Sequence, residues 1–271
     1  MVQGVHGGGF SNVDRTATPG AFVQYLDQLT AMEPVQRYKR ESYRLAGARP
    51  GARILDVGCG AGDDVRALGA LVGSTGLVTG IDSSATMIAE AQRRAEGHGL
   101  PVEFRVGDIY ALDYPDASVD GCRADRVFQH LEDRPAALAE LVRVLRPGGC
   151  VVVTDPDWET LIVDLPDREL IRKVFRFRCD GYRAGWSGRQ TPRLMREQGL
   201  SAITVFPVTP TITDFAFADQ IFLFRQYAAK AQEAGALTPD ELATWLRLLD
   251  EADRAGTFFS AFTFFTVAGR K

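Results

Sequence analysis

Three alternating glycines mark the segment of this chain best suited to hold a ligand. The run Ile54-Leu55-Asp56-Val57 is apolar apart from one acid, and it leads into Gly58, Gly60 and Gly62. Apolar residues then follow at helical spacing, at positions 65, 68 and 71. The pattern predicts a strand, a tight turn and a helix, with a turn whose backbone a ligand can approach closely.

The spacing of the glycines separates the ligands that such a turn could hold. A dinucleotide fingerprint, G-x-G-x-x-G, has its third glycine where Asp63 stands here. A carboxylate at the mouth of the helix would repel a pyrophosphate, and Asp56 adds a second negative charge at the strand end. No G-K-[ST] follows, which excludes a phosphate-binding P-loop. Two acids beside the turn suit a cationic ligand instead, such as an ammonium or a sulfonium.

Polar residues also stand where the other expected strands end. We expect strands over residues 53–57, 77–81, 102–106, 119–124 and 150–154, separated mostly by helical segments. This alternation predicts a doubly wound, mostly parallel α/β sheet, in which ligands bind beyond the carboxyl ends of the strands. Five residues fall at or just past these ends: Asp56, Asp82, Asp108, Arg126 and Asp155. We therefore expect them to converge on one rim of the sheet.

The rest of the chain predicts helices before and after this core. Residues 19–46 are helical in pattern, and residues 166–182 and 191–199 predict two later helices. Residues 202–208 and 258–268 predict the sixth and seventh strands, with helices at 214–234 and 239–255 between them. The expected fold is a seven-stranded sheet with an N-terminal helical cap and helical insertions after strands five and six. Long insertions of this kind usually carry function.

The acid followed by G-x-G-x-G resembles the first motif of the class I S-adenosylmethionine (SAM)-dependent methyltransferases. The resemblance covers about residues 48–154 and implies a Rossmann-like fold, SAM as cofactor and S-adenosylhomocysteine as product. It implies that Asp82 takes both ribose hydroxyls, because a carboxylate can accept two hydrogen bonds from a vicinal diol. It also implies that Asp108 receives the adenine amino group and that Asp56 holds the ammonium, directly or through water. The other implied cofactor residues are Tyr25, Gly58, Cys59, Gly60, Gly62, Ser83, Met87, Gly107, Ile109 and Arg126.

Residues 124–133, ADRVFQHLED, resemble the segment after the fourth strand in the ubiquinone/menaquinone-type subgroup. There the segment passes under the methionine part of SAM and ends at a histidine near the reacting methyl. His130, one of three histidines in the chain, is accordingly a candidate general base, since an imidazole titrates near neutrality. Asp155 and Asp157 are candidates to orient His130 or hold a substrate hydroxyl, and Pro156 between them predicts a turn. Structural roles stay open for Asp82 and His130 as helix caps and for Arg126 as an ion pair.

Aromatic residues are frequent in the two insertions and favour an apolar or aromatic substrate. The substrate-binding candidates are Trp158, Phe175, Tyr182, Trp186, Phe222 and Tyr227. The expected reaction is methyl transfer to a small molecule, at oxygen first, then carbon, then nitrogen. Two alternatives stay open, a SAM-binding protein that catalyses another step such as a cyclisation, and a nicotinamide-dependent oxidoreductase. A pure binding module is the least favoured.

Composition agrees with an enzyme that acts on small molecules. The 271 residues are 45% hydrophobic and carry a net charge of −4, which disfavours a nucleic-acid partner. The four cysteines include no C-x-x-C pair, so no zinc site or disulfide framework is indicated, and we expect a cytoplasmic protein without membrane segments. A homodimer is left open.

The expected organisation is a flexible tail at 1–18 and one domain at 19–271. The domain comprises cap helices at 19–47, a cofactor-binding half at 48–155 and insertions at 156–200 and 209–256.

Overall fold

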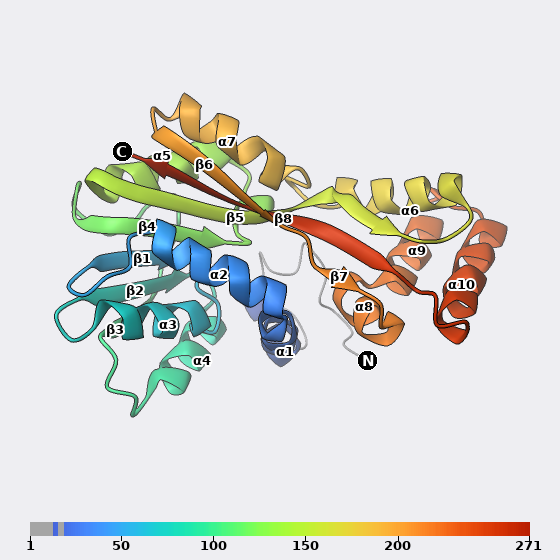
Figure 1. Cartoon of the computed structure of the whole chain (residues 1–271), viewed down its shortest axis with the longest axis horizontal. Coiled ribbons are helices and arrows are strands. Elements are labelled where there is room, and N and C mark those ends of the chain that lie inside the picture. The colour runs from blue at the N-terminus through green and yellow to red at the C-terminus, as the bar shows by residue number, and fades with distance from the viewer. Residues whose placement is uncertain (1–12, 16–18) are drawn as a thin grey trace.

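The computed structural model describes residues 13–15 and 19–271, which form one mixed sheet with helices on both faces (Figure 1). The strand order is β3-β2-β1-β4-β5-β8-β6, and a short strand, β7, pairs with β8. β1 to β5 run parallel, whereas β8 is antiparallel to β5, β6 and β7. The strands are β1 (Arg53–Val57), β2 (Leu77–Asp82), β3 (Val102–Val106), β4 (Val119–Asp125), β5 (Leu145–Val163), β6 (Ser201–Val208), β7 (Thr211–Ile212) and β8 (Ser260–Arg270). The predicted doubly wound α/β fold is confirmed, with β7 as one additional strand.

The parallel register brings the strand ends together. Val57 pairs with both Ile81 and Ala124, and Asp82 pairs with Val106, so β1 to β4 end at nearly the same level. The residues just beyond these ends therefore share one rim, as doubly wound sheets require.

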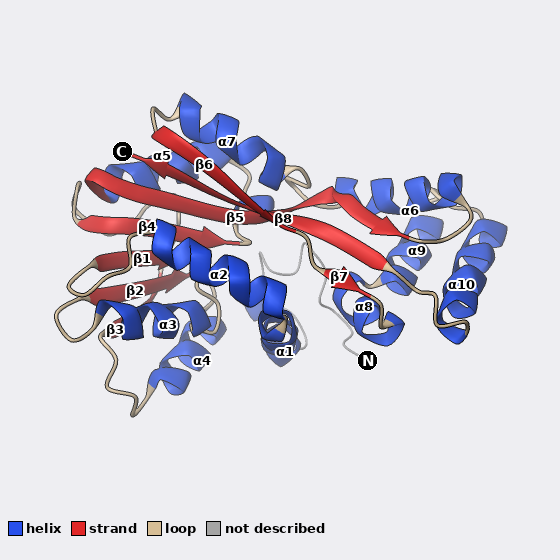
Figure 2. Ribbon diagram, viewed as in Figure 1, coloured by secondary structure: helices blue, strands red, loops and turns tan. Residues whose placement is uncertain are grey.

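Ten α-helices surround the described part of the sheet (Figure 2). They are α1 (Pro19–Ala31), α2 (Glu33–Leu45), α3 (Asp63–Val72), α4 (Ala85–Ala95), α5 (Arg134–Val144), α6 (Arg168–Asp180), α7 (Ser187–Glu197), α8 (Phe215–Phe222), α9 (Phe224–Glu233) and α10 (Pro239–Arg254), with a 3-10 turn, η2, at Phe128–His130. Apolar side chains of α2, α3 and α4 pack on one face of the sheet, and those of α5 and α7 pack on the other. No helix among the described residues is both long and apolar enough to span a bilayer.

Three predicted helices differ from the structure. The segment 19–46 forms two helices that break at Met32, and 214–234 forms two helices that break at Leu223, whose φ is 55°. α7 begins at Ser187 instead of Thr191, so Pro192 lies inside it. Tertiary packing explains the earlier start, because Ser187 is buried and its Oγ donates a 2.6 Å hydrogen bond to Asp155 in β5.

β5 is much longer than the predicted strand 150–154, and the turn predicted at Pro156 is wrong. Pro156 pairs with Phe264 of β8, and the strand continues to Val163. Beyond Thr154 the pairing of β5 with β4 ends, so a proline without an N–H on that edge removes no ladder hydrogen bond.

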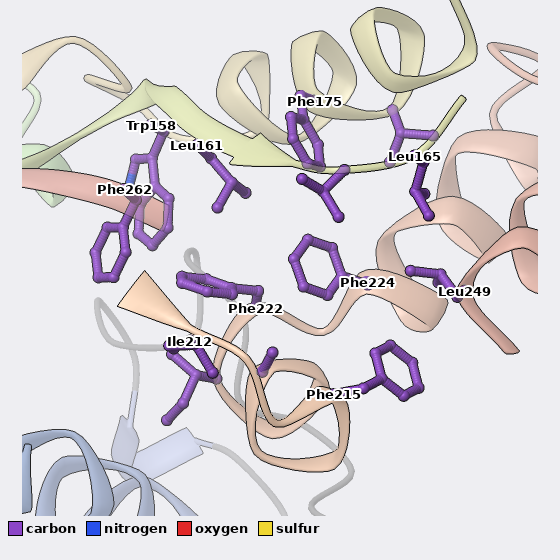
Figure 3. Packing of buried hydrophobic residues seen from close by; sticks show 14 of the residues in the cluster. Trp158, Leu161, Leu165, Phe175, Ile212, Phe215, Phe222, Phe224, Leu249 and Phe262 are labelled. Carbon is purple, nitrogen blue, oxygen red and sulfur yellow. The ribbon is translucent and has the colours of Figure 1, made fainter. Parts of the chain in front are cut away.

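The insertions form a second lobe on the protruding ends of β5 and β8 (Figure 1). Its core contains side chains from β5, β8, α6, α8, α9 and α10. Figure 3 shows Phe222, Phe224 and Phe262 packed together between these elements. Trp245 of α10 is fully buried in the same cluster. This lobe is thus a packed body and not a set of loose loops.

Residues 1–12 and 16–18 of the predicted tail lie outside the described residues. Residues 13–15, in contrast, form a short 3-10 turn beside the N-terminus of α4. Asp14 accepts hydrogen bonds from Ser84 Oγ at 2.5 Å and from the Ala85 N–H at 2.9 Å. These bonds add to the N-cap of α4, in which Ser84 Oγ accepts from the Met87 N–H.

Candidate functional site

A cavity of about 810 Å³ opens at the carboxyl ends of β1 to β4. Its wall continues past the rim of the sheet to α1, to the protruding ends of β5 and β8, and to α6, α8 and α9 of the second lobe. A volume of this size suits small molecules and cofactors, for which pockets of about 300–1,000 Å³ are typical.

The glycine turn contributes backbone to this cavity. Gly58, Cys59 and Gly60 line it, and Gly58 has φ 73°. A Cβ at Gly58 would lie 2.3 Å from Val127 Cγ2, so any larger residue would disrupt the contact between the turn and the loop after β4. Gly62 does not line the cavity, contrary to its predicted contact with the cofactor. A Cβ at Gly62 would lie 2.6 Å from Phe104 Cε1, so the lack of a side chain at this position allows α3 to pack closely on the sheet.

Asp82 is the acid that the turn holds most directly. The Gly60 N–H donates to Asp82 Oδ2 and the Ser84 N–H donates to Oδ1, both at 2.9 Å. Burial raises the pKa of the Asp82 carboxyl, against the effect of these backbone donors. Each oxygen keeps a second lone pair, so the carboxylate can still accept two hydroxyl groups from the cavity, which it lines. Backbone N–H groups therefore fix it as a bidentate acceptor.

The predicted adenine side of the rim also lines the cavity. Ser83, Met87, Gly107, Asp108 and Ile109 are all in its wall. Asp108 Oδ1 accepts a 3.0 Å hydrogen bond from the Tyr110 N–H, which fixes the carboxylate. Sequence reasoning missed Tyr110, whose hydroxyl accepts from the Glu132 N–H at 3.1 Å and so ties the loop after β3 to the loop after β4.

Asp56 does not reach the cavity, which corrects its predicted contact with an ammonium. Arg123, fully buried in β4, donates to Asp56 Oδ1 at 2.8 Å and pairs with Asp64 and Asp125 at 2.9 Å each. Lys39 of α2 also pairs with Asp64, at 2.6 Å, and with Asp125, at 3.1 Å. Burial raises the pKa of Asp56 to about 6. Burial also acts on Asp64, but Arg123 and Lys39 outweigh it and hold the pKa of Asp64 far below its usual range.

This charge cluster sits directly under the cavity. Its three carboxylates, Asp56, Asp64 and Asp125, are matched by three cations, because Arg126 lies 3.6 Å from Asp125 in addition to Lys39 and Arg123. Asp64 and Asp125 line the cavity, whereas the sequence pattern had pointed to Asp56 and Asp63. Asp63 also lines the cavity but pairs with Arg66 and Arg94. The cluster thus brings two carboxylates to the wall, but neighbouring cations balance their charge.

Arg126 lines the cavity in a strained backbone conformation, with φ 62°. Its Nε lies 3.6 Å from Asp125 Oδ1, so the two charges attract but do not form a hydrogen bond. That Nε is buried without a hydrogen-bond acceptor among the described residues. A non-glycine residue held at positive φ is a common feature of binding sites, where the surrounding structure supports the strain. The guanidinium can therefore receive an oxygen from a ligand.

His130 lies in the cavity wall, whereas Asp155 and Asp157 do not. The His130 ring is 6.3 Å from the ring of Tyr182, centroid to centroid. Asp155 accepts from Ser187, and Asp157 pairs with Arg189 Nη2 at 2.7 Å, so their predicted roles beside His130 are wrong. The reason is the alternation of a strand: Pro156 and Trp158 face the cavity, and Asp155 and Asp157 face away.

Three of the six predicted substrate residues line the cavity, namely Trp158, Tyr182 and Tyr227. The rings of Trp158 and Tyr182 stack with their centroids 4.6 Å apart. Phe175 and Phe222 instead belong to the core of the second lobe, and Trp186 is 44% exposed beside Arg189. Tyr25 of α1 also lines the cavity, and burial raises the pKa of its phenol.

Sequence reasoning missed Arg178, Phe262 and Phe264, which line the same part of the cavity. Arg178 had no signal in the sequence because it lies among other arginines of α6. The two phenylalanines read as strand residues, and only the protrusion of β8 brings them to the wall.

Known proteins resemble this chain in sequence and in fold. A family model described as a methyltransferase domain matches residues 54–149. An uncharacterized 37.1 kDa protein in transposon Tn4556 of Streptomyces fradiae is 42% identical over 92% of this chain and 71% of its own length. A 2-phytyl-1,4-naphtoquinone methyltransferase from Synechococcus elongatus is 34% identical over 44% of this chain, which thus spans about half (52%) of that enzyme.

The fold also matches the structure of Haemonchus contortus phosphoethanolamine N-methyltransferase 2 in complex with SAM, with a TM-score of 0.59. The match covers 99% of this chain and 60% of the Haemonchus chain. At 19% identity this likeness shows the shared fold alone. The cavity fits the cofactor of the family, because its wall offers a bidentate carboxylate at Asp82 and the backbone of Gly58 and Gly60. The chain belongs to the class I SAM-dependent methyltransferases, and its cofactor is S-adenosyl-L-methionine.

Proposed function

We propose that this protein methylates a small, largely apolar molecule that carries an aromatic or conjugated ring. The observation that carries the proposal is that one cavity joins the glycine-turn rim to the ring pair Trp158–Tyr182 of the second lobe. A cofactor on the rim and a planar acceptor on these rings would thus share one enclosed space. A hydroxyl oxygen is the first choice of acceptor atom, followed by carbon and then nitrogen.

In this proposal, different rim residues contact different parts of the cofactor. Asp82 would accept both ribose hydroxyls, and Asp108 and Ile109 would bound the adenine. The backbone of Gly58 and Gly60 would face the methionine part. Arg126 is a candidate for its carboxylate, because the guanidinium lines the cavity with an unsatisfied Nε. Asp64 and Asp125 would supply the carboxylate that was predicted at Asp56.

Bound SAM supplies a methyl group on a positively charged sulfur. The protein's own residues place the acceptor and exclude water, and placement of this kind is a large part of catalysis. Trp158 is held for this purpose, since its Nε1 donates a 2.7 Å hydrogen bond to Gln129 Oε1. A ring nitrogen of His130 would accept the proton of an acceptor hydroxyl, a role typically worth about 10²–10⁴-fold in rate.

One relative bears on the kind of acceptor. The Synechococcus protein is named as a methyltransferase of a naphthoquinone that carries a phytyl chain. This name supports ring-containing, quinone-like molecules and aromatic secondary metabolites as the first set of acceptors to test. Residence in the cytoplasm is part of the same proposal.

Two measurements test the proposed function. Thermal shifts with SAM, S-adenosylhomocysteine and NAD should show stabilisation by the first two alone, because each binds the folded state. Incubation with SAM and a library of hydroxylated aromatics and quinols should then yield S-adenosylhomocysteine and a methylated acceptor in equal amounts. Stabilisation by NAD alone would overturn the proposal. Conversion of a compound without S-adenosylhomocysteine would favour a cyclisation or a related step.

A further inference from the structure

Arg178 of α6 is a buried cation that faces the cavity far from the glycine turn in sequence. The residue is only 3% exposed. Its Nη1 donates to the carbonyl oxygen of Phe222, which anchors one side of the guanidinium. Its Nε is closed off from solvent and has no hydrogen-bond acceptor among the described residues. Nη2 also has no acceptor among the described residues, so two of the three guanidinium nitrogens are left for a ligand.

No carboxylate in residues 13–15 and 19–271 forms an ion pair with Arg178. The other arginines of the cavity differ in this respect, since Arg126 attracts Asp125 and Arg183 pairs with Glu132. A buried guanidinium without a counter-charge is costly, because water no longer stabilises it. The cavity thus lacks one negative charge at Arg178.

Aromatic rings surround this cation. Arg178 Cζ lies 4.6 Å from the ring centroid of Trp158 and 4.3 Å from that of Tyr227. The ring faces attract the charge, but they cannot satisfy the Nε–H with an acceptor in its own plane. A planar ligand that packs beside Trp158 could bring an oxygen to the unpaired edge of this guanidinium, because guanidinium groups bind oxyanions through their planar fork.

The aromatic residues also connect Arg178 with the candidate base. The centroid of the Tyr182 ring lies 4.6 Å from that of Trp158 and 6.3 Å from that of His130. A ring laid along this row would have one end near Arg178 and the other near His130. The row therefore fits an acceptor with a charged anchor at one end and the methylated atom at the other.

We propose that Arg178 is a specificity-determining residue that binds an anionic oxygen on an aromatic or conjugated acceptor. The oxygen belongs to a carboxylate or to an ionised enol or phenol, whose shared chemistry is a delocalised negative charge. This inference rests on the proposed function and sharpens it, because it replaces a wholly apolar acceptor with an amphiphilic one.

The test uses the protein saturated with S-adenosylhomocysteine and two probes of equal shape, 2-naphthoate and 2-naphthamide. Calorimetric titration should show that naphthoate binds at least about tenfold tighter than naphthamide. Arg178→Gln should abolish this preference and leave naphthamide binding unchanged, and Arg178→Lys should keep part of it. Arg183→Gln is the matched control, since Arg183 lines the cavity but is half-exposed and already paired.

Each outcome decides the inference. Equal affinities for the two probes, failure of both to bind, or a preference that survives in Arg178→Gln would overturn it. A loss of S-adenosylhomocysteine binding in Arg178→Gln would assign Arg178 to the cofactor and also overturn it. Should that variant not fold, the wild-type preference and Arg178→Lys still decide. Failure of the wild-type protein to bind S-adenosylhomocysteine would instead refute the proposed function.

Discussion

Arg123 Nη1 lies 2.8 Å from Asp56 Oδ1, and the two side chains are 0% and 2% exposed. The acid that precedes the glycine turn is thus committed to a buried arginine on the neighbouring strand. Asp64 and Asp125 complete the surroundings of the same guanidinium. These two acids line the cavity and Asp56 does not, so Asp56 supports the site from behind.

Asp56→Asn should therefore lower stability more than cofactor affinity. The change leaves Arg123 with one counter-charge fewer, and breaking a buried pair typically costs about 3–5 kcal/mol. Two other carboxylates remain on Arg123, so we expect the lower end of that range. Urea unfolding measures the loss, and titration with S-adenosylhomocysteine should show less than about a threefold change in affinity, or about 0.6 kcal/mol. A large loss of affinity in a stable variant would return Asp56 to the binding site.

Asp82→Ala should have the reverse effect. The variant loses the acceptor for two hydroxyls, each hydrogen bond to a charged group being worth about 1.5–3 kcal/mol. We expect S-adenosylhomocysteine to bind at least about tenfold more weakly by calorimetry. Asp108→Ala is the comparison on the next strand end and should weaken binding less, because Asp108 is more exposed. Unchanged affinity in Asp82→Ala would show that the ribose assignment is wrong.

His130→Ala should reduce turnover and change its dependence on pH. The loss of a general base typically costs about 10²-fold or more, and the rise of kcat on the acidic side of the profile should disappear. His98→Ala is the control, since His98 is exposed on a loop between two glycines. Full turnover of His130→Ala at every pH would mean that placement of the acceptor alone accounts for the rate.

Asp155 should make stability depend on pH. Burial raises its pKa to about 8, from 3.8 in the unfolded chain. The folded state then binds more protons between these values, so its contribution to stability is full below about pH 4 and falls as pH rises toward 8, at up to about 1.4 kcal/mol per pH unit.

Urea unfolding of wild type and Asp155→Asn at pH 5, 6.5 and 8 measures this contribution. The variant should lose less stability than wild type over the series, and Asp116→Asn, at an exposed position, should follow wild type. Equal slopes for wild type and Asp155→Asn would contradict protonation of Asp155 in the folded state.

Local patterns in the sequence predict the sheet and its rim well. The strand ends at Asp82 and Asp108 and the turn at Gly58 follow from apolar runs, glycine spacing and parallel register. These features depend on residues close together in the chain, which is why they are readable. The division into a tail and one domain remains a prediction.

The errors arise where distant segments decide the structure. Pairing with β8 keeps β5 extended past Pro156. The alternation of side chains along β5 then turns Asp155 and Asp157 away from the cavity. Asp56 is removed from the site by Arg123, which is 67 residues away in the chain. Arg178 becomes a site residue only because the second lobe folds over the rim. None of these relationships has a local signature.

The most direct test of the shared cavity is a crystal structure with S-adenosylhomocysteine bound. The ribose hydroxyls should lie on Asp82, the adenine beside Asp108 and Ile109, and the sulfur should face His130 and Tyr182. A ligand whose ribose avoids Asp82, or whose sulfur points away from His130 and Tyr182, would contradict a cavity divided between cofactor and acceptor.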